Sequence, residues 1–199
     1  MKGISRQRAE VCTTDYSCPM TQPIRLADLT ATQAAGFDQP FAMLEACHER
    51  LHRMLALLAR LREHLGPHGA DAQAQQAARD VMRYFDQAAP QHHRDEELHV
   101  FPPLLLQGDA AVVAVVRRLQ ADHERMEGDW AAARQVLQAI VEGQAPRSAQ
   151  EPALTGFAAL YEQHVADEEQ IVYPAAQAVL DAPAIRAIGE EMMRRRGVA

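Results

Sequence analysis

The sequence predicts an all-α protein, an up-down-up-down four-helix bundle with an irregular N-terminal arm and a short C-terminal fifth helix. The residues that dominate are Ala, Leu, Gln, Glu and Arg, and all of them favour helix. Few segments alternate apolar and polar residues as a strand would. Four long helical segments are joined by short connectors, which is typical of antiparallel neighbours in a bundle.

The chain of 199 residues divides into three predicted parts. Residues 1–37 show no strong periodicity and are interpreted as the arm. Residues 38–180 form the bundle, and residues 181–199 form the C-terminal helix and tail. The expected ranges of the five helices are 40–66, 72–101, 109–143, 148–180 and 181–196.

The ends of these segments carry helix signals. Pro40 suits the first turn of the first helix, and Asp109 is an N-cap candidate for the third. Ser148 with Glu151 three residues later predicts a capping box for the fourth. Pro102-Pro103 is expected to close the second helix.

Charge and hydropathy exclude several kinds of protein. The net charge of −7 argues against nucleic-acid binding, which needs a basic face. The one dense basic run, Arg194-Arg195-Arg196, is interpreted as a solvated helix end. The longest apolar run, Ala110 to Val116, is far too short to span a membrane.

Targeting and cysteine signals are equally weak. Residues 1–12 have no hydrophobic region of a signal peptide, so we expect the protein to be cytoplasmic. Cys12, Cys18 and Cys47 form no zinc-like pairs and predict no disulfide framework. Cys47 is expected to be a small core residue.

The most informative feature is an internal repeat. The sequence HERL at 48–51 is matched by HERM at 123–126. The pattern H-x-x-x-E-E-x-x-V-F-P at 92–102 is matched by H-x-x-x-E-E-x-x-V-Y-P at 164–174. One helical hairpin therefore occurs twice, which predicts a bundle with approximate two-fold symmetry and a natural place for two equivalent metal ions.

The spacing of these residues indicates a metal centre. His and Glu four positions apart, as in His92/Glu96 and His164/Glu168, share one helix face. His92 lies fourteen residues before Leu106, and His123 lies fourteen residues after Asp109. Both therefore lie roughly 21 Å from the same turn, at a common depth. Burying such groups without a metal ion would be very costly.

The donor types narrow the choice of metal. Mixed imidazole and carboxylate ligands without thiolate fit two iron ions or two manganese ions better than structural zinc. Four histidines, two bridging carboxylates and an oxo or hydroxo bridge supply about ten of the roughly twelve bonds that two six-coordinate ions need. About two positions would remain open to a small ligand.

With these motifs the sequence resembles the hemerythrin-like proteins, the HHE cation-binding family, over residues 38–178. Its ligand pattern is most similar to that of bacterial di-iron proteins that repair iron centres after nitrosative or oxidative damage. The resemblance implies two iron ions, with Mn or Zn as possible substitutes. It implies that His48, His92, His123 and His164 are terminal ligands and that Glu96 and Glu168 bridge the two ions.

The resemblance has one clear departure. Oxygen-carrying hemerythrins use a fifth histidine in an H-x-x-x-H pair and an H-x-x-x-x-D segment. Here the last helix has Glu168 four residues after His164 and no matching Asp.

Several other residues have open roles. His52, four after His48, could be a fifth histidine ligand, and Glu127 could join the site. His93 is interpreted as a surface or ligand-orienting group, as are Glu97 and Glu169. We expect His99 to be exposed and Trp130 to lie in the core. Tyr161 is expected either to pack in the core or to line a pocket.

Two functions fit these residues. One is a protein that binds or senses dioxygen, nitric oxide or peroxide. The other is an iron donor or enzyme in iron-centre repair or in defence against oxidative or nitrosative stress. Whether the protein is an enzyme, and whether it is a monomer or a homodimer, stays open.

Overall fold

The structure is a computed structural model, and it describes residues 36–146 and 150–198. All of these described residues belong to one compact unit. The predicted arm, apart from its last two residues, lies outside the described residues, and so do Cys12, Cys18 and the capping residue Ser148.

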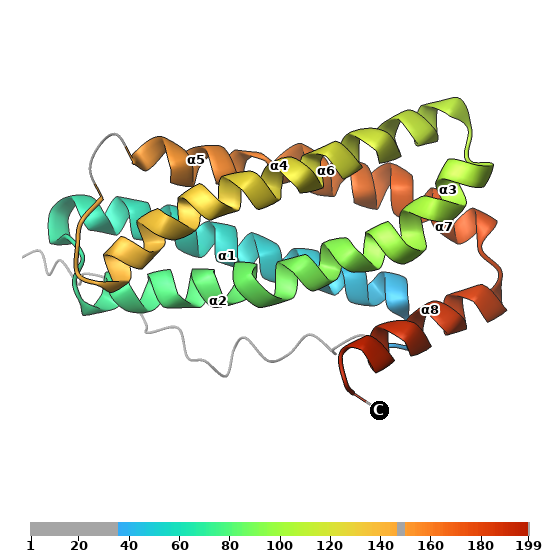
Figure 1. Cartoon of the computed structure of the whole chain (residues 1–199), viewed down its shortest axis with the longest axis horizontal. Coiled ribbons are helices and arrows are strands. Elements are labelled where there is room, and N and C mark those ends of the chain that lie inside the picture. The colour runs from blue at the N-terminus through green and yellow to red at the C-terminus, as the bar shows by residue number, and fades with distance from the viewer. Residues whose placement is uncertain (1–35, 147–149, 199) are drawn as a thin grey trace, which may run out of the picture. The chain divides into compact units, whose positions relative to one another are not determined.

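The described residues confirm the all-α prediction, because they contain helices and no strand. Within the described residues the bundle has four helical rods, at 40–68, 72–107, 110–141 and 151–179, and a last helix at 182–195 follows them (Figure 1). In chain order the elements are α1 (Pro40–His68), α2 (Ala72–Asp95), a π-helical turn (Glu96–Val100), α3 (Phe101–Gln107), α4 (Ala110–Val141), α5 (Glu151–Ala159), α6 (Tyr161–Asp167), a second π-helical turn (Glu168–Val172), α7 (Tyr173–Val179) and α8 (Ala182–Arg195).

Three helices begin at aspartate N-caps. The side chains of Asp71, Asp109 and Asp181 accept hydrogen bonds at 2.9 Å from backbone N–H groups of the first turns of α2, α4 and α8. These N–H groups have no partner within their own helix. The predicted cap at Asp109 is therefore confirmed.

The second rod does not end at Pro102-Pro103, so that prediction was wrong. The chain continues through α3 to Gln107. Pro102 and Pro103 lie in the first turn after the π-helical turn, where the missing N–H of proline costs little. In the fourth rod Pro174 has the same place at the start of α7.

A layer of buried polar side chains separates two apolar clusters. One cluster centres on Phe85, Phe157 and Tyr161, and the other on Phe101 and Tyr173. Between them lie the buried polar residues His48, His92, Asp95, Glu96, His123, His164, Asp167 and Glu168. The apolar clusters supply the hydrophobic stabilisation, while the polar layer would oppose folding unless its groups are paired.

Helix α8 packs on the bundle through its own basic end. Arg195 and Arg196 both form ion pairs with Asp95, whose side chain is 1% exposed. The prediction that this run is a solvated helix end was therefore wrong for these two residues. Gly189 approaches the backbone of Phe37 so closely that a Cβ atom there would lie 1.8 Å from the Phe37 carbonyl oxygen.

Among the described residues, the longest and most apolar helices still fall short of what a membrane span requires.

Candidate metal centre

The four predicted histidines come from the four rods and meet in the buried layer. His48 lies on α1, His92 on α2, His123 on α4 and His164 on α6. All four are buried, with at most 8% of the residue exposed. The helices therefore bring them to one depth, as their spacing from the helix ends predicted.

The histidines form two pairs. The Nε2 atoms of His48 and His92 are 3.0 Å apart, and those of His123 and His164 are 3.2 Å apart. Two nitrogen ligands each about 2.1 Å from one ion and at right angles to each other would be roughly 3.0 Å apart. Each pair therefore has the spacing of two neighbouring ligands on one ion.

The two buried glutamates connect the pairs. Glu96 places Oε1 3.5 Å from Nε2 of His92 and Oε2 3.5 Å from Nε2 of His123. Glu168 places Oε2 3.2 Å from Nε2 of His48 and Oε1 2.9 Å from Nε2 of His164. Each carboxylate thus directs one oxygen to each histidine pair, which is the arrangement of a carboxylate that bridges two ions.

The site has unmet bonding capacity that a cation would satisfy. Both glutamates are 0% exposed. Within the described part of the chain, both oxygens of Glu168 and Oε2 of Glu96 lack a partner with hydrogen-bond geometry. An unpaired carboxylate in the interior is strongly unfavourable. Nitrogen and oxygen donors without thiolate suit iron, manganese or zinc, so the residues fit a metal pair.

The unmet charge is reflected in the pKa values of the carboxyl groups. Burial, and next the charge of Glu168, raise the pKa of Glu96 well above its usual value. Burial also favours the neutral form of Glu168, but the close imidazoles of His123, His164 and His48 outweigh it and lower that pKa well below the usual value. Two carboxylates this close cannot both ionise cheaply without a cation between them.

The same environment keeps one imidazole ready to bind a cation. Burial, and then the neighbouring His48, lower the pKa of His92 to about 3. The ring is therefore neutral near pH 7, which is the form that ligates metals.

Two further carboxylates orient the histidines from outside. Oε1 of Glu169 lies 2.8 Å from Nδ1 of His48, and Oε1 of Glu97 lies 3.0 Å from Nδ1 of His123. An Nδ1–H that donates to a carboxylate leaves the lone pair of Nε2 directed at the centre. The interpretation of Glu97 and Glu169 as ligand-orienting groups agrees with these contacts.

The aromatic residues of the repeat complete the layer, which sequence reasoning missed. The Tyr173 hydroxyl donates to Oε1 of Glu96 at 2.5 Å, and the Tyr173 ring stacks on His48 with centroids 5.6 Å apart. The equivalent residue Phe101 stacks on His123 at 5.6 Å. The match between Phe101 and Tyr173 in the repeat was the available signal.

The π-helical turns begin at the two bridging candidates. The N–H of Phe101 donates to the carbonyl of Glu96, and the N–H of Tyr173 donates to the carbonyl of Glu168, five residues back in each case. Such turns are frequent at functional sites. Here each π-helical turn keeps side chains spaced four residues apart on the buried face of the rod over several turns.

The other residues that the sequence offered as possible ligands lie at different distances from the buried layer. Two groups of side chains have ligand atoms close enough together to hold a metal ion: His48, His92, Glu96 and Glu168, and His93, His123 and His164. The side chain of His52 is exposed and lies outside both groups. Glu127 is also exposed and outside them. His93 is half-buried, and one of its nitrogens lies within 4.8 Å of ligand atoms of His123 and His164. Its ring stacks on that of His123 with centroids 4.1 Å apart.

Three other expectations can be compared with the structure. His99 is not exposed, because it is half-buried and pairs with Glu191 at 2.7 Å. Trp130 packs against the core, as expected, and its Nε1–H donates to Asp86. Tyr161 is a buried core residue that also lines a cavity.

A comparison with known families agrees with this geometry. Residues 39–176 match the hemerythrin HHE cation-binding domain, which covers more than half of the chain, so the chain belongs to this family. It is therefore a metal-binding, hemerythrin-like protein whose His/Glu cluster can hold metal.

A curated relative covers nearly the same length. An uncharacterized protein of Haemophilus influenzae is 29% identical over 170 residues, which are 85% of this chain and 97% of that protein.

Proposed function

We propose that this protein holds two iron ions on His48, His92, His123, His164, Glu96 and Glu168, and that the pair reversibly binds a small ligand such as dioxygen, nitric oxide or peroxide. The observation that carries the proposal is the position of the carboxylates, each of which has one oxygen beside each histidine pair. When bound, the irons would supply open coordination positions and redox chemistry.

The chain's own residues would hold the pair and restrict access to it. The outer carboxylates Glu97 and Glu169 orient two of the imidazoles, and Tyr173 donates a hydrogen bond to Glu96. The apolar clusters on both sides keep bulk water from reaching the layer along the bundle axis. A buried, preorganised donor set of this kind binds metal without a large rearrangement.

The second candidate function is iron donation or catalysis in iron-centre repair or stress defence. The observation that favours it is on the last rod, where the buried Glu168 lies four residues after His164 and no Asp takes the place that an oxygen carrier would use. The geometry of the bridging carboxylates is common to both functions, so spectroscopy and transfer assays must separate them. A cytoplasmic location and a monomeric or homodimeric state remain predictions.

The test combines metal analysis with optical spectra recorded in the reduced state, in air and with nitric oxide. We expect two irons per chain and a reversible change of the visible spectrum with one of the gases. Iron transfer to an apo-acceptor, or turnover of peroxide or nitric oxide, would instead support the second function. A chain that folds fully and takes up no metal would refute both.

Variants of the bridging candidates test the assignment of residues. Glu96→Gln and Glu168→Gln keep the side-chain volume and remove the charge, so each should lower the content to about one metal ion or none. Glu49→Gln, next to His48 but exposed, is the matched control and should keep two ions. If either bridging variant retained two irons and the native spectrum, the assignment would be wrong.

A further inference from the structure

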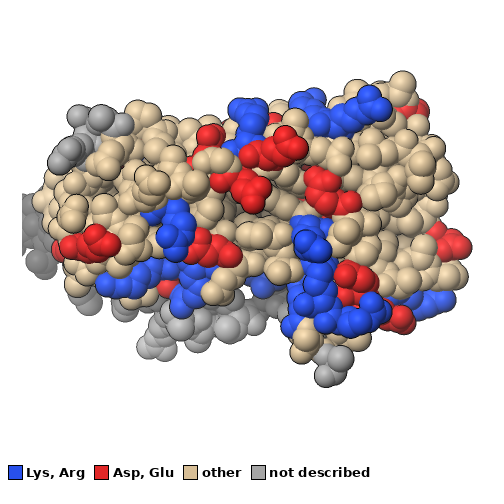
Figure 2. All heavy atoms as spheres, in the orientation of Figure 1, with Lys and Arg blue, Asp and Glu red and all other residues tan. Residues whose placement is uncertain are grey.

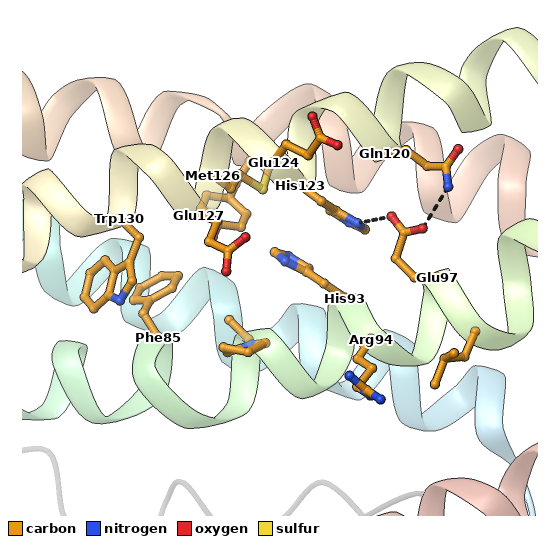
Figure 3. Close-up of a pocket in the computed structure, with 14 residues that line it drawn as sticks. Phe85, His93, Arg94, Glu97, Gln120, His123, Glu124, Met126, Glu127 and Trp130 are labelled. Atoms are coloured by element: carbon orange, nitrogen blue, oxygen red, sulfur yellow. Dashed lines mark hydrogen bonds and ion pairs between the residues drawn. The ribbon is translucent and has the colours of Figure 1, made fainter.

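A cavity of 510 Å³ lies between α2 and α4 and borders the metal layer. His93 and His123 line its inner end, and its opening lies on the face of the bundle formed by these helices (Figure 3). Figure 2 shows acidic and basic side chains on this face of the molecule, and the cavity lining includes Arg94 as well as Glu97, Glu124 and Glu127.

The volume of this cavity is out of proportion to a diatomic ligand. A water molecule takes about 30 Å³ of liquid, and dioxygen or nitric oxide need little more. Pockets that bind organic molecules usually have about 300–1,000 Å³. The cavity therefore has room for an organic molecule of moderate size next to the metal layer.

One wall of the cavity is apolar and aromatic. It is formed by Phe85, Met126, Trp130 and Tyr161. The rings of Phe85 and Trp130 lie 5.1 Å apart, and hydrogen bonding of Trp130 to Asp86 fixes its indole. Such a wall suits a flat or branched apolar group, and aromatic faces also attract a nearby cation.

The charge inside the cavity is negative. Figure 3 shows the carboxylate of Glu127 directed into the space in front of His93, whereas Arg94 and Glu124 point away from it. The carboxylate of Glu97 is already engaged by His123 and Gln120. Glu127 is therefore the charged group that is free to recognise an occupant of the cavity.

His93 offers a second polar contact at the inner end. Within the described residues, neither of its nitrogens has a hydrogen-bond partner, although the side chain is half-buried. Its ring nitrogens are thus available to an occupant of the cavity, and one of them lies within 4.8 Å of ligand atoms of His123 and His164. The ring stacks on His123, so an occupant that touches His93 lies directly beside the second histidine pair.

The metal pair itself would not reverse this charge preference. The four carboxylates Glu96, Glu97, Glu168 and Glu169 lie in or around the layer and together offset the charge of two divalent ions. The charge that an occupant meets is then set by Glu127.

We propose that this cavity binds a small organic amine with an apolar, preferably aromatic, body. The body would lie against Phe85 and Trp130, and the ammonium group would pair with Glu127 beside His93. This site goes beyond the binding of a diatomic ligand or peroxide at the metal pair, and it would place an organic molecule within reach of that pair.

Trp130 makes the proposal directly measurable, because it is the only tryptophan in the chain and lines the cavity. Three probes of similar size and different charge are titrated into the full chain: 2-phenylethylamine, 2-phenylethanol and 3-phenylpropionate. Binding is followed by Trp fluorescence and confirmed by calorimetry. We expect saturable binding of the amine, at least tenfold weaker binding of the alcohol, and no saturable binding of the carboxylate.

Two variants locate the amine. Glu127→Gln keeps the shape of the site and removes its charge, so it should weaken amine binding about tenfold and leave alcohol binding unchanged. Asp129→Asn removes an exposed charge from the same helix, outside the cavity lining, and should leave both unchanged. Equal binding of all three probes, absence of saturable binding, or an amine affinity that Glu127→Gln does not alter would overturn the proposal.

Metal analysis of the same samples keeps this proposal separate from the proposed function. Amine binding by a chain without metal would support the cavity and count against the metal pair. A chain with two metal ions and no amine binding would do the opposite.

Discussion

Replacing both Arg195 and Arg196 by alanine should destabilise the protein much more than replacing a comparable surface arginine. The two guanidinium groups are the cations that meet Asp95, and Nη1 of Arg196 lies 3.1 Å from its Oδ1. The Asp95 side chain is 1% exposed, while those of the arginines are 14% and 20% exposed. The double variant would leave an almost fully buried carboxylate without a counter-ion.

The magnitude follows from that burial. Removing one partner of a buried ion pair costs about 3–5 kcal/mol, because the remaining charge stays desolvated. Since the arginines are partly exposed and water can enter once they are truncated, we expect a loss at the lower end, about 3 kcal/mol. The matched control is Arg118→Ala. Arg118 pairs with the repeat-equivalent Asp167 but is 52% exposed, so its loss should cost less than about 1 kcal/mol.

The assay is urea unfolding followed by circular dichroism, with chelator present so that metal binding adds nothing to the free energy of unfolding. The double arginine variant is made in the native chain and in an Asp95→Asn background. In that background no buried charge is left unpaired, so the arginines should cost only about 1 kcal/mol. An equal loss in both backgrounds would refute the view that the arginines act by neutralising Asp95.

Two other predictions concern helix α8 and its contacts. The hydrogen bond from Arg195, against a smaller opposing effect of burial, lowers the pKa of Glu191 from its usual 4.5 to about 2. Because the folded-state value is the lower one, this stabilisation is full above pH 4.5 and is lost as the pH falls towards 2. In urea unfolding, Glu191→Gln should therefore cost up to about 1 kcal/mol at pH 7, a value already reduced for solvent screening. This cost should disappear as the pH falls towards 2. A difference that does not depend on pH would contradict the prediction. Gly189→Ala would place a Cβ atom 1.8 Å from a backbone oxygen and should lower the melting temperature, whereas Gly128→Ala on α4 meets nothing within 4 Å and should stabilise by about 0.5–1 kcal/mol. Similar thermal shifts for the two glycine variants would show that the close approach of α8 does not matter.

The fold could be predicted to a large extent because its signals are local. Pro40 in the first turn of the first helix and the N-cap at Asp109 each act within a few residues, and the structure has helices where these signals indicate them. The fate of Arg195 and Arg196 could not be predicted in this way. Their partner Asp95 lies 100 residues earlier, and its burial is a property of the packed bundle.

The π-helical turns were missed although the sequence contains a signal for them. The inward residues His92, Glu96, Val100 and Leu104 are four apart for three steps. In an α-helix with 3.6 residues per turn, three such steps would rotate the last residue about 120° off the buried face. All four are nevertheless buried, because the π-helical turn between them has more residues per turn and so absorbs the excess rotation. The second copy shows the same spacing over His164, Glu168, Val172 and Ala176.

Part of the candidate site could likewise be predicted from the sequence, and part of it could not. The repeat identified the histidines and glutamates that share a face, and the structure brings all six together. The position of His93 beside His123 depends on how α2 rotates against α4, which no spacing within one helix reveals. His52 lies four residues after His48, a spacing that predicts a shared helix face, but its side chain is exposed to solvent.

The way in which the two hairpins share the centre bears on its ancestry. Each hairpin contributes one histidine pair of its own and one glutamate that reaches both pairs. A single ancestral hairpin, self-associated as two chains, would thus already have contained every type of ligand, and because both copies have the wide turn, that turn is most simply explained as older than the gene fusion. The two halves differ in detail. The second half has Tyr173 where the first has Phe101. The first half has His93 where the second has Val165.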